Sequence, residues 1–205
     1  MATEPPQLSA IQVATLLFVM LGPLKFLGPF VAGTRTLDDA AIRSLAIKAT
    51  IMATVTVIVG AFVGKGMMQN MGISLPALLL AAGVVFFLVS LRLVMAEYDH
   101  APAPEPAAPL TAFETAFPLV VTPYGMAGVI ALLTAAGDDS RRVMTILGIV
   151  LVMMVLDLVF MIYARAILAK VGLPFRLFGA VLGIIMLGLS IEVMLDALRR
   201  GGLIT

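Results

Sequence analysis

Residues 16–34 read LLFVMLGPLKFLGPFVAGT, an apolar stretch that contains two prolines, three glycines and one lysine. Its length is that of a helix that crosses a membrane. Proline removes an amide donor and obstructs the carbonyl four residues earlier, while glycine loosens the backbone around it. We therefore expect a helix that is kinked or broken between Leu21 and Pro29. Such backbone is tolerated at membrane depth only where it is packed in protein or lines a wet cavity.

The composition of the whole chain supports a membrane location. Of the 205 residues, 61% are apolar and 12% are charged, against roughly 45 to 50% and about 25% in soluble domains. Six apolar stretches are each long enough for one crossing, at about 20 residues per bilayer. We predict six helical spans, because the strands of a barrel would alternate apolar and polar residues. The stretches lie at residues 9–33, 42–65, 74–96, 112–135, 143–165 and 174–198.

The residue totals also exclude several classes of function. The net charge is +1, so the chain has no basic field that would attract nucleic acid. With no cysteine and the single histidine His100, it cannot build a zinc or haem site, and we predict no metal and no cofactor. No span offers a nucleophile with a nearby base, so we predict no catalytic residue, and an intramembrane enzyme is the weakest hypothesis.

The two halves of the chain share marker residues. When residues 20–100 are laid without a gap over residues 120–200, ten positions coincide, and most of them are not bulky apolar residues. Three spans per half turn the second copy over in the membrane, so we predict an inverted three-plus-three repeat, as in many alternating-access transporters. A duplication kept only for stability is the alternative. The matches include Pro23/Pro123, Gly28/Gly128, Thr34/Thr134, Gly72/Gly172 and Ser90/Ser190.

We interpret residues 1–205 as one transmembrane domain with repeat halves 8–96 and 112–200. A linker rich in proline and alanine, residues 97–111, joins the halves. Its segment EYDHAPAPEPAAP contains four prolines and no bulky aliphatic residue, which is typical of a semi-rigid extended connection.

The candidate site combines the equivalent irregular segments of the first and fourth spans. The fourth span contains PLVVTPYG at residues 118–125. Half-helix N-termini at such breaks carry a partial positive charge that suits a carboxylate. Two proline kinks that only shape the bundle are the plainer alternative. The predicted substrate-binding residues are Gly22, Pro23, Lys25, Gly28, Thr122, Pro123, Tyr124 and Gly125.

Asp157 needs an explanation because it lies well inside the fifth span, between Met153–Leu156 and Leu158–Phe160. An ionisable side chain at such a depth costs roughly 2.5 to 3.5 kcal/mol on insertion scales. It requires a partner from another helix, and Lys25 is the candidate. A carboxylate that faces a cavity can also bind a proton or a sodium ion coupled to transport. An inert structural ion pair is the alternative.

Two further features bear on partners and orientation. The small-residue patterns Gly60-x-x-x-Gly64 and Gly179-x-x-x-Gly183 permit close helix packing, either inside one bundle or across the seam of a homodimer.

Basic residues at the span ends divide almost evenly between the two sides, so the sequence does not predict an orientation. The partners expected are the lipid bilayer and a small-molecule substrate.

Three segments resemble helices of the MarC family, small bacterial six-helix inner-membrane proteins that include the SnatA-type neutral amino acid transporters. They are LFVMLGPLKFLGPFVAGT at 17–34, ISLPALLLAAGVVFFLVSLRLV at 73–94 and AFPLVVTPYGMAGVIALLT at 116–134. The resemblance extends over residues 10–198. It implies a multi-pass protein of the bacterial inner membrane that exports or exchanges small neutral amino acids.

This chain departs from the family pattern at one position of the first helix. Many members carry Asn-Pro-x-Gly there, whereas this chain has Gly22-Pro23-Leu24-Lys25. A lysine in the cavity could pair with a substrate carboxylate or with Asp157. The fourth helix keeps the Pro-x-Gly feature in Thr122-Pro123-Tyr124-Gly125.

We therefore expect a secondary transporter with alternating access at a midplane site between the first and fourth helices. The alternative is a membrane scaffold or partner subunit that carries no cargo.

Overall fold

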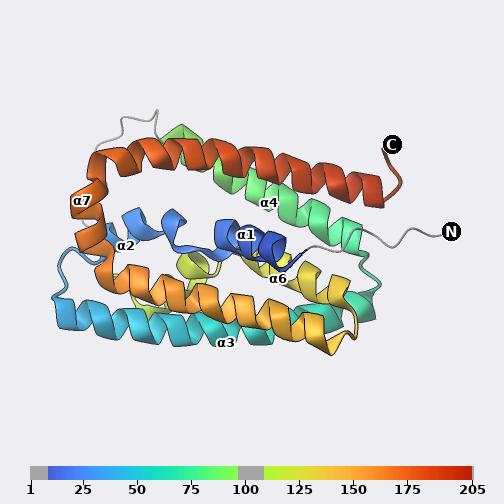
Figure 1. The fold of residues 1–205 in the computed structure, drawn as a ribbon, viewed down its shortest axis with the longest axis horizontal. Helices are drawn as coiled ribbons and strands as arrows, with labels where there is room; N and C mark the ends of the chain where they lie inside the picture. The colour runs from blue at the N-terminus through green and yellow to red at the C-terminus, as the bar shows by residue number, and fades with distance from the viewer. Residues whose placement is uncertain (1–8, 97–108, 205) are drawn as a thin grey trace.

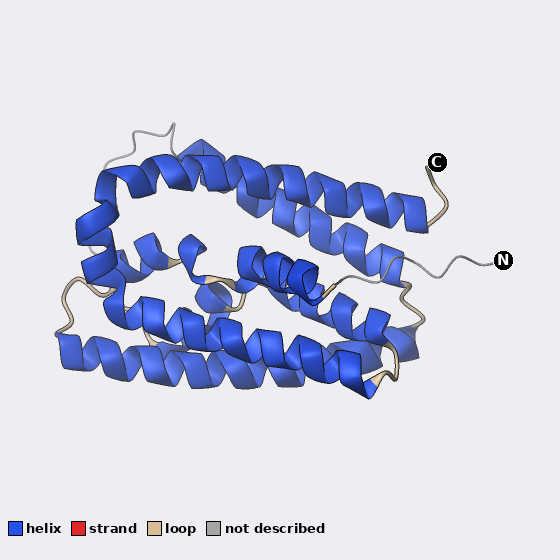
Figure 2. Cartoon of the chain, viewed as in Figure 1, coloured by secondary structure: helices blue, strands red, loops and turns tan. Residues whose placement is uncertain are grey.

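The computed structural model describes residues 9–96 and 109–204, and within them it describes the backbone but not the side chains of residues 24, 93, 96, 171–180 and 182. All regular elements in these two ranges are helical (Figure 2). The predicted linker 97–111 lies almost wholly outside the described residues.

The first apolar stretch is broken where its prolines and glycines predict. Helix α1, Ala10–Leu21, starts with a capping box between Ser9 and Gln12 and ends at Gly22, whose backbone is extended. A single 3₁₀ turn, η1 (Pro23–Lys25), follows, and α2, Leu27–Gly33, completes the stretch. Pro23 can open η1 because the first amides of a helix have no partner to lose.

The fourth apolar stretch is broken as well. Helix α5, Ala112–Glu114, leads into η2, Thr115–Val120, which contains the cis peptide bond Phe117–Pro118 and the non-helical residue Phe117. Helix α6, Pro123–Ala136, then starts after its N-cap residue Thr122. The parts before and after this break are inclined to each other by 63°.

Three long helices surround these broken segments. Helix α3, Asp39–Met71, is capped by the Asp38 side chain and ends at Gly72, which adopts a φ of +66° that favours glycine. Helix α4 spans Leu75–Ala96, and α7 spans Ser140–Arg200 after its cap Asp139. The sequence predicts separate fifth and sixth spans, whereas α7 is helical throughout. Figure 1 shows α7 turning back sharply, so that its two arms run in opposite directions.

The lengths and compositions of the helices show an integral multi-pass membrane protein. In the described part of the chain, three segments are long and apolar enough to cross a bilayer: Asp39–Met71, Leu75–Arg92 and Ser140–Lys170. The bent pair Ala112–Val120 and Pro123–Ala136 would form a fourth span, and α1 is a shorter apolar helix. The six-span inverted repeat stays a prediction.

The broken segments lie inside the bundle. Figure 1 shows α1, α2 and α6 between two layers of helices. One layer consists of α3 and the first arm of α7, and the other consists of α4 and the second arm of α7. Both α1 and α6 contact α7. The outer faces are apolar, as expected where lipid replaces water. Exposed aliphatic residues there include Ile51, Val55, Val59, Leu88, Val152 and Val155.

Candidate functional site

The end of α1 meets the start of α6, so the two breaks lie against each other. The Thr122 hydroxyl donates a hydrogen bond of 3.3 Å to the main-chain oxygen of Met20. Gly125, in the first turn of α6, has no room for a side chain, because a Cβ there would lie 2.7 Å from Leu21 Cδ2 and 3.2 Å from the Met20 oxygen. The glycine therefore permits the close approach of the two broken helices.

Lys25 points into this junction from the end of η1. Its Nζ donates to the Met20 oxygen and, at 3.4 Å, to the Thr122 hydroxyl. The same nitrogen lies 5.5 Å from the centre of the Tyr124 ring, within the range of a cation–π interaction. The lysine thus joins the two breaks with its charged end.

The Met20 oxygen is available because α1 stops there. The last four carbonyl groups of a helix have no amide partner within the helix, and the extended Gly22 ends α1 at Leu21. Two side chains take the place of the missing amides, the Lys25 ammonium and the Thr122 hydroxyl. The ammonium also lies at the end of α1 where the helix dipole is negative.

The aromatic wall of the junction links it to α4. The Tyr124 ring stacks on Phe86, with ring centres 4.7 Å apart and planes inclined by 16°. Both side chains are buried. The ring that faces Lys25 is therefore held in place by a helix outside the two broken segments.

Asp157 is fully buried on α7, at 0% exposure. Neither of its carboxylate oxygens accepts a hydrogen bond from any described residue. Its charge and that of Lys25 attract each other, although no ion pair within 4.0 Å joins them among the described residues. A buried carboxylate without a bonded partner is costly, so Asp157 has unused capacity to bind a cation, a proton or a donor group.

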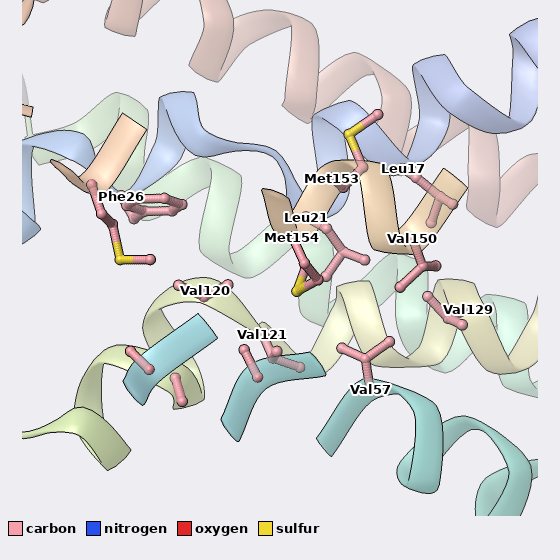
Figure 3. Close-up of a cluster of buried hydrophobic side chains, with 14 of the residues drawn as sticks. Leu17, Leu21, Phe26, Val57, Val120, Val121, Val129, Val150, Met153 and Met154 are labelled. Carbon is pink, nitrogen blue, oxygen red and sulfur yellow. The ribbon is translucent and has the colours of Figure 1, made fainter. Parts of the chain in front are cut away.

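Met153 and Met154 lie one turn before Asp157 on α7, and Figure 3 labels both of them among the buried apolar side chains of the core. The same buried cluster contains Leu21 and Phe26 of the first broken stretch and Val120 and Val121 of the second. All six side chains are buried. Asp157 therefore follows, along α7, two methionines that belong to the same apolar core as both breaks.

The structure brings most of the predicted site residues together. Gly22 and Pro23 are buried at the first break, and Thr122, Tyr124 and Gly125 are buried at the second. Pro123 opens α6 but is exposed. Gly28 lies in α2 with no atom within 4 Å of a Cβ built on it, so it makes no close contact of the kind seen at Gly125.

Sequence reasoning missed two participants. Met20 takes part through its main-chain oxygen. Every residue type has such an oxygen, so the sequence cannot single out this position. Phe86 is one of several apolar residues in α4, and its contact with Tyr124 depends on how α4 and α6 pack.

A cavity of about 860 Å³ lies elsewhere, among α2, α3 and α7. Its polar lining includes Arg43, Ser44, Tyr163 and Arg165, and none of the predicted site residues lines it. Arg165 donates to the main-chain oxygens of Thr34 and Leu37, at 2.6 and 2.7 Å, and so holds the loop between α2 and α3. In the described ranges, no three His, Cys, Asp or Glu side chains form a group that could hold a metal ion.

Comparison with known proteins gives one family. The model of the MarC family of integral membrane proteins matches residues 8–201. A UPF0056 membrane protein of Archaeoglobus fulgidus is 25% identical over 193 residues, which cover 91% of this chain and 90% of that protein. A UPF0056 membrane protein of Methanocaldococcus jannaschii is 23% identical over 190 residues, 89% of this chain and 92% of its own length. No solved structure matches this chain.

Proposed function

The chain belongs to the MarC family of integral membrane proteins, and from that premise we propose that it is a secondary transporter of small neutral amino acids. In this proposal two inverted halves of three spans each alternate access to a midplane site between the first and fourth helices. Export or exchange across a bacterial inner membrane is the direction and location that the resemblance favours, while the two relatives described above are archaeal.

One observation carries the proposal: two broken helices meet inside the bundle beside a lysine and a buried carboxylate that has no hydrogen-bond partner in the described part of the chain. A neutral amino acid is a zwitterion with one carboxylate and one ammonium group. The start of α6 and the Lys25 ammonium favour the substrate carboxylate. The Asp157 carboxylate favours the substrate ammonium, or a proton or cation coupled to its movement.

Equivalent positions of the two halves support the repeat on which alternating access depends. Thr34 and Thr134 each donate to the carbonyl four residues earlier. Ser90 and Ser190 are both fully buried, and each donates to a main-chain oxygen of its own helix. The two serines are alike in burial, whereas Thr34 is fully buried and Thr134 is half-buried.

The experiment is counterflow of labelled alanine, glycine and threonine in proteoliposomes, with and without proton and sodium gradients. We expect uptake by the wild-type protein and at least a tenfold lower rate for Asp157→Asn, because the amide keeps the shape of the side chain and removes its charge. Asp196→Asn is the matched control, since Asp196 lies on the same helix and pairs with Arg200 on the surface. Its rate should equal that of the wild type.

Folded wild-type protein that neither binds nor moves any amino acid of the panel contradicts the proposal. If that protein also copurifies with a membrane partner, the scaffold alternative is favoured. Wild-type rates in Asp157→Asn would instead leave the transporter in place and remove Asp157 from its site.

A further inference from the structure

The junction of the two breaks has the ligands of a monovalent-cation site. The positive charge in that site is supplied by a side chain of the protein itself. We propose that the Lys25 ammonium occupies such a site, and that a free cation such as Na⁺ binds there once the lysine side chain is removed. The inference rests on the proposed function only in treating this junction as the transport site.

The groups around the ammonium are those that a small hard cation prefers, namely carbonyl, hydroxyl and carboxylate oxygens. The Met20 oxygen and the Thr122 hydroxyl are within hydrogen-bond distance of Nζ. The Asp157 carboxylate supplies the opposite charge at longer range. The face of the Tyr124 ring completes the surroundings, and an aromatic face also attracts cations.

These ligands are held by contacts that do not involve Lys25. The Thr122 hydroxyl accepts from the Gly125 amide at 3.2 Å and donates to the Met20 oxygen. The Tyr124 ring is fixed by its stacking on Phe86. The Met20 oxygen belongs to the end of α1, where the helix dipole adds negative potential. The arrangement should therefore persist when the lysine side chain is shortened.

Asp157 provides the driving force for cation uptake. Its oxygens have no hydrogen-bond partner among the described residues, and Lys25 is the cationic group that its charge attracts. Without that ammonium the carboxylate becomes an uncompensated buried charge, which is strongly unfavourable. A cation that enters the vacated space removes that penalty.

This arrangement predicts how the natural protein depends on sodium. Because an attached ammonium fills the site, wild-type stability and flux should not require Na⁺. If Lys25 served only as one member of a structural ion pair, the expected result would differ. Its removal would then lower the stability of the protein by the same amount in every salt.

The test is thermal unfolding of the purified protein in detergent, with no amino acid present. Wild type, Lys25→Ala, Lys25→Met and the double variant Lys25→Ala/Asp157→Asn are compared in sodium, potassium, methylammonium and N-methyl-D-glucamine chloride at constant ionic strength. The last cation is too large for the site and serves as the reference. Lys48→Ala is the matched control, since Lys48 is an exposed lysine of α3.

We expect the Tm of Lys25→Ala to rise saturably with at least one small cation, by roughly 5 °C at about 100 times its Kd. Wild type and Lys48→Ala should show no such rise. Lys25→Met should not respond either, because its side chain fills the space without a charge. The double variant should not respond, because it lacks the carboxylate.

Equal responses of Lys25→Ala and wild type overturn the inference, as does a response that survives in the double variant. If Lys25→Ala does not fold in the reference salt, a small cation should restore its monodisperse peak in size-exclusion chromatography. Lys25→Ser serves as a second shortened variant, and failure of both Lys25→Ala and Lys25→Ser to fold in every salt also overturns the inference. None of these readouts uses transport, so a wild-type protein without flux would contradict the proposed function and leave the cation result standing.

Discussion

The hydroxyl of Thr122 lies 3.3 Å from the main-chain oxygen of Met20, a residue 102 positions earlier in the chain. Thr122 is the N-cap residue of α6, and Met20 lies in the last turn of α1. One hydroxyl thus caps the start of one helix, binds the end of another and accepts from Lys25. It makes the two breaks into a single junction.

Replacing Thr122 by valine keeps the shape of the side chain and removes all three hydrogen bonds. We expect a loss of about 2 kcal/mol in the free energy of unfolding, since a lost cap and unpaired buried groups each cost about 1 to 2 kcal/mol but overlap here. The Tm should fall by roughly 4 to 8 °C. Thr145→Val is the control, because Thr145 is exposed and its hydroxyl donates to the Arg141 carbonyl of its own helix. Equal Tm values for the two variants would show that the junction does not depend on this hydroxyl.

The Tyr124 ring should matter more than its hydroxyl. The ring contacts Phe86 by stacking and Lys25 by its face, and each such contact contributes roughly 0.5 to 1.5 kcal/mol. Tyr124→Phe should therefore stay near the wild-type Tm, whereas Tyr124→Leu should lose roughly 2 to 12 °C. Differential scanning fluorimetry in detergent measures both. A larger loss in Tyr124→Phe than in Tyr124→Leu would assign the effect to the hydroxyl.

Gly125→Ala should separate the two breaks. The new methyl group would stand 2.7 Å from Leu21 Cδ2 and 2.8 Å from Thr122 Oγ1, closer than packed atoms approach. We expect a loss of about 1 to 3 kcal/mol, as for other overpacked sites, and slower flux in the counterflow assay. Gly148→Ala is the matched control, because no atom lies within 4 Å of a Cβ at that exposed helical position. A variant at Gly125 as stable as the control would contradict the close approach of α1 and α6.

Arg165 should stabilise the loop between α2 and α3. Its guanidinium donates to the Thr34 and Leu37 oxygens and pairs with Asp39 at 3.3 Å. The side chain is 38% exposed, so solvent weakens these bonds, and we expect Arg165→Met to lose about 1 kcal/mol. Hydrogen exchange of the amides of residues 35–38 should speed up. Arg199→Met, which removes a surface ion pair with Glu192, should leave that exchange unchanged.

The elements themselves were largely predictable because local chemistry determines them. Proline and glycine end α1 at Leu21, and the side chains of Asp38 and Asp139 cap α3 and α7 as short acidic residues do before a helix. The sequence predicts separate spans at residues 143–165 and 174–198, whereas α7 is helical from Ser140 to Arg200 and its two arms run in opposite directions (Figure 1).

The candidate site was predictable in part. Sequence placed Lys25, Thr122, Tyr124 and Gly125 at the breaks, and the structure brings them together. Gly28 carried the same signal, a glycine beside a proline, yet it makes no close contact. A pattern shows where a helix is weak, but it does not show which side of the break faces the neighbouring helix.

By itself, the sequence determined that the chain is an all-helical membrane protein with two broken helices, because apolar length and proline chemistry act within a single segment. Only the tertiary structure decided that the two breaks meet. The Met20 oxygen became a ligand, Phe86 became a support for Tyr124, and Asp157 was left without a hydrogen-bond partner among the described residues. Each of these relations joins helices far apart in the chain, and such contacts depend on how side chains from several helices fill one interior.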